Sequence, residues 1–340
     1  MSKLGPDLDQ FQDPWGLLRR MVLSGDPAAR WVLMQRAASL LARPLDGLLG
    51  HIETRRNQDA APVHLPLILI VGAPRAGTTL LHQVLVRGLN VAYFDNLGSL
   101  FPRATLTGRS LFGRPSRAAP SSFSSFYGST AGWRAPNDGF HVWNRWLGDH
   151  RYRAKQELSE AEAEDMRRFF AHWLKWAGKP LLNKNNRNAD CVPMLADALE
   201  DAVFVEISRE PEYVVQSLLL ARVEVQGRVE HGWGLDSEPV DPGADRETAI
   251  DAVCDQVMRI QRKLERAASM VGPDRFMSLR YEDLCSDPGA IVRSVAAFVP
   301  QVELRRDADL GKIGPFPPRN EPRLPAWEIR RIRDRWDALR

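Results

Sequence analysis

The segment from Leu65 to Leu89 constrains the fold more than any other part of the sequence. An apolar run over 67–71 leads into a glycine-containing turn, and apolar residues then recur at helical spacing. The expected order is therefore strand, loop, helix. Because such a loop gathers backbone N–H groups and the positive end of a helix dipole around one point, it suits a phosphate or sulfate group.

Gly72 and Gly77 have the spacing of the triphosphate-binding loop, in which four residues separate two glycines. That loop needs a lysine directly after its second glycine, and this chain has Thr78 there. Something other than a triphosphate is therefore favoured. Arg75, inside the loop, can donate to two oxygens of the anion through its planar guanidinium.

Apolar runs alternate with helical patterns along the rest of the chain. This order predicts an α/β fold, a P-loop-NTPase-like parallel sheet flanked by helices, with the ligand at the carboxyl ends of the strands. The expected strands are residues 67–71, 91–95, 181–184, 202–208 and 276–281.

Three helices are expected within the first 60 residues, with Pro27 and Pro44 opening the second and third. We interpret residues 1–60 as a helical collar packed on an α/β domain of residues 61–340, because amphipathic helices usually bury their stripe within their own protein. The mixture of apolar residues and arginines leaves a membrane surface as the alternative.

Residues 97–150 are interpreted as a lid on the acceptor side of the site. They begin with a long stretch that is rich in Gly, Pro, Ser and Arg and has no periodicity, which is typical of functional lids or of poorly ordered segments. The aromatic cluster at 140–146 follows, and it suits either the core or an acceptor pocket.

The whole composition excludes some classes of partner. A net charge of +3 from 46 basic and 43 acidic residues gives no reason to expect nucleic acid. No apolar stretch is long enough for a transmembrane segment, and the odd, widely spaced cysteines at 191, 254 and 285 favour reduced thiols in a cytoplasmic protein. The oligomeric state cannot be read from the sequence.

A second anion-binding pattern lies downstream of the loop. Arg209 ends an expected strand and Ser217 follows two turns into the next helix, so a cationic fork and a hydroxyl could meet a dianionic phosphate. The turn Pro-Arg-Ala-Gly-Thr-Thr at 74–79 closely resembles the phosphosulfate loop of sulfotransferases that use 3′-phosphoadenosine-5′-phosphosulfate (PAPS). In that family an arginine and a serine with this spacing hold the 3′-phosphate.

Two further segments carry the resemblance, which spans about residues 65–300. LLNKNNRN, at 181–188, resembles the segment of tyrosylprotein sulfotransferases that presents a lysine to the transferring sulfate, which implies that role for Lys184. RYEDLCSDP, at 280–288, resembles a downstream segment of the family and implies that Tyr281 contacts the nucleotide.

The resemblance implies in-line transfer of a sulfuryl group from PAPS to an acceptor hydroxyl, with release of adenosine 3′,5′-bisphosphate (PAP) and without a metal. The loop would bind the 5′-phosphosulfate through Arg75, Ala76, Gly77, Thr78 and Thr79. The acceptor stays open among small molecules such as phenols, carbohydrates, lipids and peptides.

Asp95 is the first candidate for the general base, because it lies close to where the tyrosylprotein enzymes carry a catalytic glutamate. The sequence departs from their paired glutamates here, so Asp138 and His141 stay as alternatives. His82 is off the apolar stripe of its helix and is interpreted as a satisfied or exposed histidine.

Two other functions fit parts of the pattern. A P-loop kinase or other nucleotide-binding phosphotransferase would share the strand–loop–helix unit, but would require the missing loop lysine and magnesium. A non-catalytic nucleotide-binding protein would have no need for the combination of Arg75, Lys184, Arg209 and Ser217.

Overall fold

A computed structural model describes residues 13–23, 27–58, 63–112, 123, 125 and 128–340. Within these residues, parallel strands form one sheet in the order β2–β1–β3–β4. The strands are β1 (Leu67–Val71), β2 (Leu181–Lys184), β3 (Ala202–Ser208) and β4 (Phe276–Arg280). The predicted α/β class and parallel sheet are confirmed, and β4 ends one residue before the predicted 281.

The prediction of a strand at 91–95 is wrong. This buried segment forms only isolated bridges, one between Ala92 and Leu181 and one between Asp95 and Pro136. Its backbone partners change along its length, because the Ala92 N–H donates to Pro180 whereas the Phe94 carbonyl accepts from Asn137. Because the backbone hydrogen bonds of this segment go to two different parts of the chain, it does not form a continuous β-strand.

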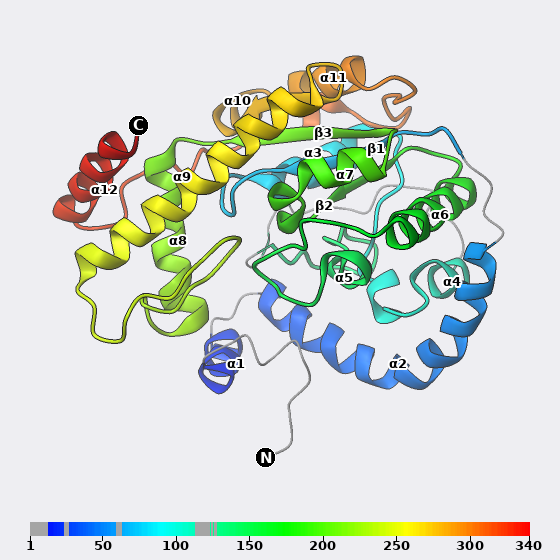
Figure 1. The fold of residues 1–340 in the computed structure, drawn as a ribbon, viewed down its shortest axis with the longest axis horizontal. Helices are drawn as coiled ribbons and strands as arrows, with labels where there is room; N and C mark the ends of the chain where they lie inside the picture. Colours follow the sequence, from blue (N-terminus) through cyan, green and yellow to red (C-terminus); the bar gives the residue numbers. More distant parts are fainter. Residues whose placement is uncertain (1–12, 24–26, 59–62, 113–122, 124, 126–127) are drawn as a thin grey trace.

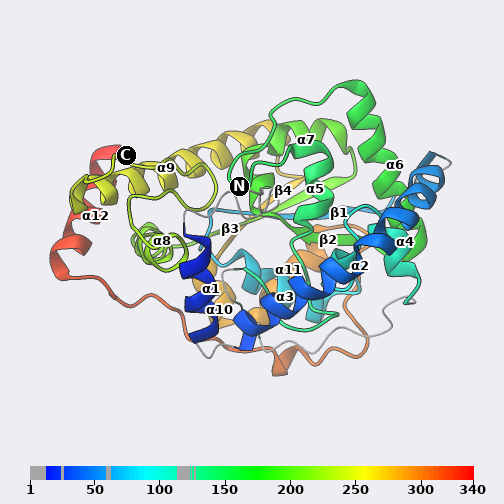
Figure 2. The same ribbon diagram turned by 90° about the horizontal axis from the view of Figure 1, so that it is seen from below.

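Helices cover both faces of the sheet (Figure 2). Side chains of β1 alternate, so Leu67 and Leu69 join the core on one face while Ile68 and Ile70 join the core on the other. The first core includes residues of α5 (Phe140–Leu147), α6 (Glu160–Ala177), α7 (Val192–Ala198) and α9 (Arg246–Val271). The second includes residues of α3 (Thr78–Gly88), α10 (Tyr281–Ser286) and α11 (Pro288–Phe298).

A third apolar cluster joins α9 to α8 (Pro211–Gln226) and α12 (Ala326–Leu339) at the far end of the sheet (Figure 1). Helix α8 follows β3 directly, because Pro211 occupies its first turn and fixes the backbone angle there. Short 3-10 helices follow Leu97, Asn185 and Asp309: η1 (Gly98–Leu100), η2 (Asn186–Asp190) and η3 (Leu310–Lys312).

Two N-terminal helices, rather than the predicted three, run along one edge of the molecule (Figure 1): α1 (Pro14–Leu23) and α2 (Pro27–Gln58). Pro44 lies inside α2 and does not open a new helix. Buried carboxylates hold α2 beyond this proline: Asp46 accepts from the N–H of Arg103 and Glu53 from that of Thr107. These contacts offset the cost of an internal proline.

Part of the segment predicted as a lid is helical, with η1, α4 (Thr105–Ser110) and α5. The aromatic cluster belongs to the core, because Trp143 and Trp146 are almost fully buried and stack against Phe170. The indole N–H of Trp143 donates to Asn183 Oδ1 at 2.7 Å, which ties the segment to β2. Residues 113–122, 124 and 126–127 lie outside the described part.

Candidate active site

The loop between β1 and α3 needs glycine at both of its ends. Gly72 and Gly77 have φ angles of 153° and 106°. A Cβ atom at Gly72 would lie 2.6 Å from the carbonyl oxygen of Ile207, and one at Gly77 would lie 2.5 Å from the Tyr281 ring. The loop therefore packs tightly between the ends of β3 and β4, and α3 begins directly after it at Thr78.

A cavity of about 230 Å³ lies at this carboxyl edge of the sheet. It is lined by residues from three strand ends, as expected for a ligand site in a parallel sheet. The predicted site residues along its wall are Arg75, Gly77, Thr78, Thr79, Lys184, Arg209 and Tyr281. Ala76 is buried in the loop, and Ser217 is joined to the cavity through Arg75, as described next.

The two predicted anion-binding patterns meet in space. Arg75 Nε donates to Ser217 Oγ at 2.9 Å, and an Arg209 terminal nitrogen donates to the backbone oxygen of Arg75 at 3.1 Å. The Arg209 guanidinium lies 4.6 Å from the centre of the Tyr281 ring. Burial lowers the pKa of Arg209 because desolvation disfavours its charge, so a bound anion would be stabilising there.

Lys184 enters the same cavity from the end of β2 and is 3% exposed. Burial lowers the pKa of its ammonium, while the negative charge of Asp138 acts in the opposite direction. A Cβ atom at Gly128 would lie 3.6 Å from Lys184 Nζ and 3.8 Å from Thr79 Oγ1. A lysine of one strand and a hydroxyl of the loop therefore converge beside this backbone.

Several lining residues were not predicted from the sequence. Asn186 lies opposite Thr78, whose hydroxyl is 3.5 Å from its side-chain oxygen. The C-terminal segment adds Phe316, Pro317 and Arg319, and Trp233 comes from the loop after α8. The Pro-rich composition of that segment marks it as irregular but does not indicate which edge of the sheet it crosses.

The C-terminal segment contacts Arg209 directly. Arg209 Nε donates to Asn320 Oδ1 at 3.0 Å, and a terminal nitrogen donates to the backbone oxygen of Arg319. The Arg319 N–H in turn donates to the Tyr281 hydroxyl at 3.3 Å. The guanidinium is thus held by neutral acceptors, which are weaker partners for it than a phosphate.

The structure argues against Asp95 as the base. Its Oδ2 accepts from Arg109 Nε at 2.7 Å and its Oδ1 accepts from the Gly98 N–H at 2.9 Å. Both members of the Asp95–Arg109 pair are almost fully buried, and Asp95 does not line the cavity. Burial raises the pKa of Asp95, and the charge of Arg109 opposes that rise. These contacts favour a structural role in anchoring α4.

Among the described residues, neither Asp138 nor His141 lines the cavity, but the negative charge of Asp138 acts to raise the pKa of Lys184, His82 and His141. Burial lowers the pKa of His141 to about 4, and its Nε2 is buried without a hydrogen-bond partner among the described residues. A pKa this low keeps His141 neutral at pH 7 and makes its ring a weak base.

His82 is buried, which excludes the exposed alternative and leaves the alternative of a histidine with internal hydrogen bonds. Its ring hydrogen-bonds to the backbone of Leu182, but its Nε2 has no hydrogen-bond partner among the described residues. Burial and, to a smaller extent, the nearby charge of Lys184 lower the pKa of His82 to about 3.

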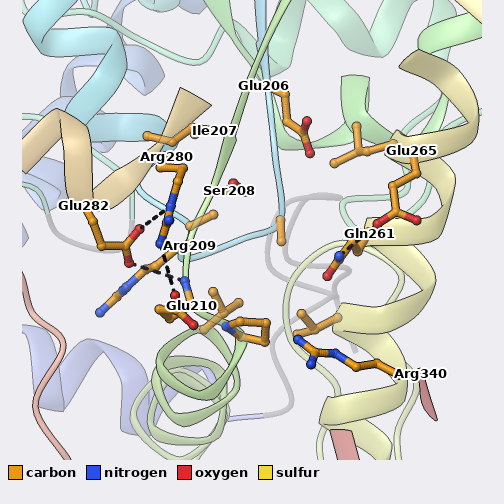
Figure 3. Close-up of a pocket in the computed structure, with 16 residues that line it drawn as sticks. Glu206, Ile207, Ser208, Arg209, Glu210, Gln261, Glu265, Arg280, Glu282 and Arg340 are labelled. Atoms are coloured by element: carbon orange, nitrogen blue, oxygen red, sulfur yellow. Dashed lines mark hydrogen bonds and ion pairs between the residues drawn. The ribbon is translucent and has the colours of Figure 1, made fainter. Parts of the chain in front are cut away.

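A second cavity of about 420 Å³ lies between the β3 end and α9 (Figure 3). Its ionisable groups satisfy one another. Arg280 lies 3.1 Å from Glu210 and 3.8 Å from Glu282, and Glu206 accepts from the Ser278 hydroxyl. With carboxylates beside its arginines, this cavity is a poorer anion site than the smaller one at the loop.

A lysine-free phosphate loop joined to a strand-end lysine and an arginine–serine pair defines a sulfotransferase-type site. The chain belongs to the sulfotransferase family, whose model matches residues 66–301. This match covers the sheet, the loop and all four strands.

Two curated relatives are similar over part of the chain. Both are named omega-hydroxy-beta-dihydromenaquinone-9 sulfotransferase Stf3, from Mycobacterium bovis and Mycobacterium tuberculosis. Each is 31% identical over 115 residues, which is 34% of this chain and 27% of the relative. The alignment therefore spans about a quarter of each relative's length.

The solved structure of the sulfotransferase STF9 from Mycobacterium avium has a similar fold. It is 17% identical, with a TM-score of 0.52, and the match covers 93% of this chain and 79% of that one. This likeness shows the fold alone.

Proposed function

We propose that this chain is a PAPS-dependent sulfotransferase that moves a sulfuryl group to an acceptor hydroxyl and releases PAP. One observation carries the proposal: a phosphate loop with Thr78 in place of lysine shares its cavity with Lys184 from a neighbouring strand. Lys184 would bring a positive charge to the transferring group, although the loop lacks the lysine that a triphosphate site requires. Family membership supports the same reaction.

The residues present fit PAPS. Arg75, Thr78, Thr79 and the loop N–H groups would hold the 5′-phosphosulfate, since charge-assisted hydrogen bonds to such oxygens are strong. Arg209 and Ser217 would hold the 3′-phosphate, and Tyr281 would contact the nucleotide beside them.

The protein's task in this reaction is positioning and charge stabilisation. A bond forms between the acceptor oxygen and sulfur, while the bond between sulfur and the bridging oxygen of the donor breaks. Lys184 would stabilise the negative charge that develops on the leaving phosphate. The acceptor proton would go to Asp138 or His141, because Asp95 is already engaged by Arg109.

We infer an apolar, hydroxylated acceptor as the first candidate, by analogy with the hydroxylated menaquinone in the relatives' names. Incubating extracts fractionated into lipids, carbohydrates, phenols and peptides with radiolabelled PAPS tests this class. Label that is recovered in the organic phase supports a lipid-like acceptor. Label that is recovered in the carbohydrate or peptide fraction would contradict the lipid-like class and favour a carbohydrate or a peptide as the acceptor.

Calorimetric titration with PAP tests the proposed nucleotide site. Arg209→Ala should weaken PAP binding about 10- to 100-fold, because it removes charge-assisted hydrogen bonds worth about 1.5–3 kcal/mol each. Arg280→Ala is the matched control, since this neighbouring arginine lines the second cavity. Equal weakening in both variants, or none in either, would contradict the assignment.

A further inference from the structure

Helix α2 has a second apolar stripe on its outward side. Its buried side includes Asp46, Leu49 and Glu53, which face α4 and η1. A separate set recurs at intervals of seven, four, three and four residues, which places its members on one face of a helix. These exposed side chains are Met34, Leu41, Leu45, Leu48 and Ile52.

The exposure of this stripe is unusually high for large apolar residues. Leu41 is 84% exposed and Leu48 is 66% exposed. Helix α1 adds Trp15 at 72% and Leu23 at 71%, and it lies along the same edge of the molecule as α2 (Figures 1 and 2). Exposed large apolar side chains that recur along one helix face indicate an interaction site rather than scattered surface residues.

The charged residues beside the stripe indicate which kind of partner it would bind. Exposed arginines lie along α2 at positions 30, 43 and 55. Asp46 and Glu53, the acidic residues in the described parts of the two helices, are buried, and Asp13, just before α1, pairs with Arg20 at 3.0 Å. The outward face is therefore apolar and cationic. Two copies meeting through this face would bring like charges together, whereas an anionic surface would complement it.

We propose that α1 and α2 dock onto the surface of an anionic lipid bilayer, with the stripe at the boundary between headgroups and acyl chains. The stripe runs from Met34 to Ile52, about 27 Å at a rise of about 1.5 Å per residue. The arginines reach the headgroups through their long stems. In the described residues, no helix has the length and apolarity to cross a membrane, so the helices lie in the plane of the surface.

The docking face contacts residues that lie on either side, in the sequence, of Gly128, which lines the loop cavity. The Gln35 side chain donates to Ser99 Oγ at 2.6 Å, and the rings of Trp31 and Trp133 are 4.8 Å apart. Docking would therefore bring the acceptor side of the molecule to the bilayer. The proposal goes beyond sulfuryl transfer and does not depend on it, because lipid binding can be measured without activity.

Sedimentation with vesicles tests the proposal. The probes are vesicles of phosphatidylcholine alone and vesicles with about 30% phosphatidylglycerol. The full chain should bind the anionic vesicles at least tenfold more tightly, and binding should fall as salt rises. Leu41→Glu with Leu48→Glu should weaken this binding at least tenfold while the melting temperature and PAP affinity stay unchanged.

Matched variants distinguish docking through this face from non-specific hydrophobic binding and from misfolding. Met270→Glu, at an exposed apolar residue near the end of α9, should bind vesicles like the unaltered chain. Arg30→Gln with Arg43→Gln should reduce the preference for anionic vesicles without changing the fold. Absence of vesicle binding, equal loss in the Met270 variant, or a dimer that Leu41→Glu converts to a monomer would each overturn the proposal.

Discussion

Thr78 stands where a triphosphate-binding loop has its lysine, and the lysine in this cavity, Lys184, comes from another element. Thr78 begins α3, while Lys184 comes from the end of β2, and both line one cavity. A lysine held by a separate strand is placed by the register of the sheet rather than by the loop. In the proposed reaction, its charge would act on the transferring group while the loop N–H groups would bind the phosphate.

Lys184→Ala is expected to lower turnover about 10²- to 10³-fold, because a preorganised charge at the leaving oxygen is lost. PAP affinity should change less than about tenfold. The measurements are PAPS turnover and PAP calorimetry, with Lys179→Ala as a control at a lysine outside the cavity. Equal losses in turnover and affinity would rule out the proposed transition-state role.

Asp95→Asn and Asp138→Asn should have opposite consequences. Removing the Asp95 charge leaves Arg109 buried without its ionic partner and should lower the free energy of unfolding by about 3–5 kcal/mol. Asp138→Asn should instead reduce turnover at least about 10²-fold with a nearly unchanged melting temperature. A stable Asp95→Asn protein with lost turnover would restore Asp95 as the base.

His82 should make the fold sensitive to acid. Its folded pKa of about 3 lies below the unfolded value of 6.5, so the unfolded state binds more protons between these values. Stability should therefore fall as pH drops below about 6.5, by up to about 1.4 kcal/mol per pH unit from this residue. Urea unfolding of His82→Gln should show a shallower dependence, unlike that of the exposed control His51→Gln. Identical slopes would contradict this account.

The sequence selected fewer than half of the described cavity-lining residues, chiefly those of the loop and the strand ends, because glycine spacing and strand-end cations carry local chemistry. It did not predict the Asp95–Arg109 pair or the approach of Arg319 to Tyr281, since both join segments that are far apart in the chain. Because Asp95 pairs with Arg109, the proposed mechanism prefers Asp138 or His141, the alternatives from the sequence, as the proton acceptor.

At the scale of elements, a capping pattern in the sequence can mark where a helix begins. Helix α6 begins with a reciprocal cap between Ser159 and Glu162, a pattern of residue types that is recognisable in the sequence. The segment 91–95 and Pro44 were misjudged for one reason. In both places tertiary hydrogen bonds override the local preference, through residues 135–137 in the first case and Asp46 in the second.

Ser159→Ala should lower the free energy of unfolding by about 1 kcal/mol, because the first turn of α6 loses its cap. Ser269→Ala, at an exposed serine in the last turns of α9, should change it by less than about 0.5 kcal/mol. Chemical denaturation of both variants measures the difference. Equal effects would show that the cap contributes nothing specific.

At the scale of the whole molecule, we propose separate tasks for the carboxyl edge of the parallel sheet and for the outer edge formed by α1 and α2. The first gathers the cationic groups that would hold the donor. The second presents apolar and cationic side chains outward. Hydrogen bonds from α2 to the segment around Ser99 connect the two edges.

The most direct test of the central claim compares PAP with ATP and magnesium as ligands of the unaltered chain by calorimetry. A phosphosulfate loop without its own lysine should bind PAP at least about 100-fold more tightly than ATP, a difference of about 2.7 kcal/mol. A preference for ATP with magnesium would contradict the sulfotransferase assignment and favour a phosphotransferase.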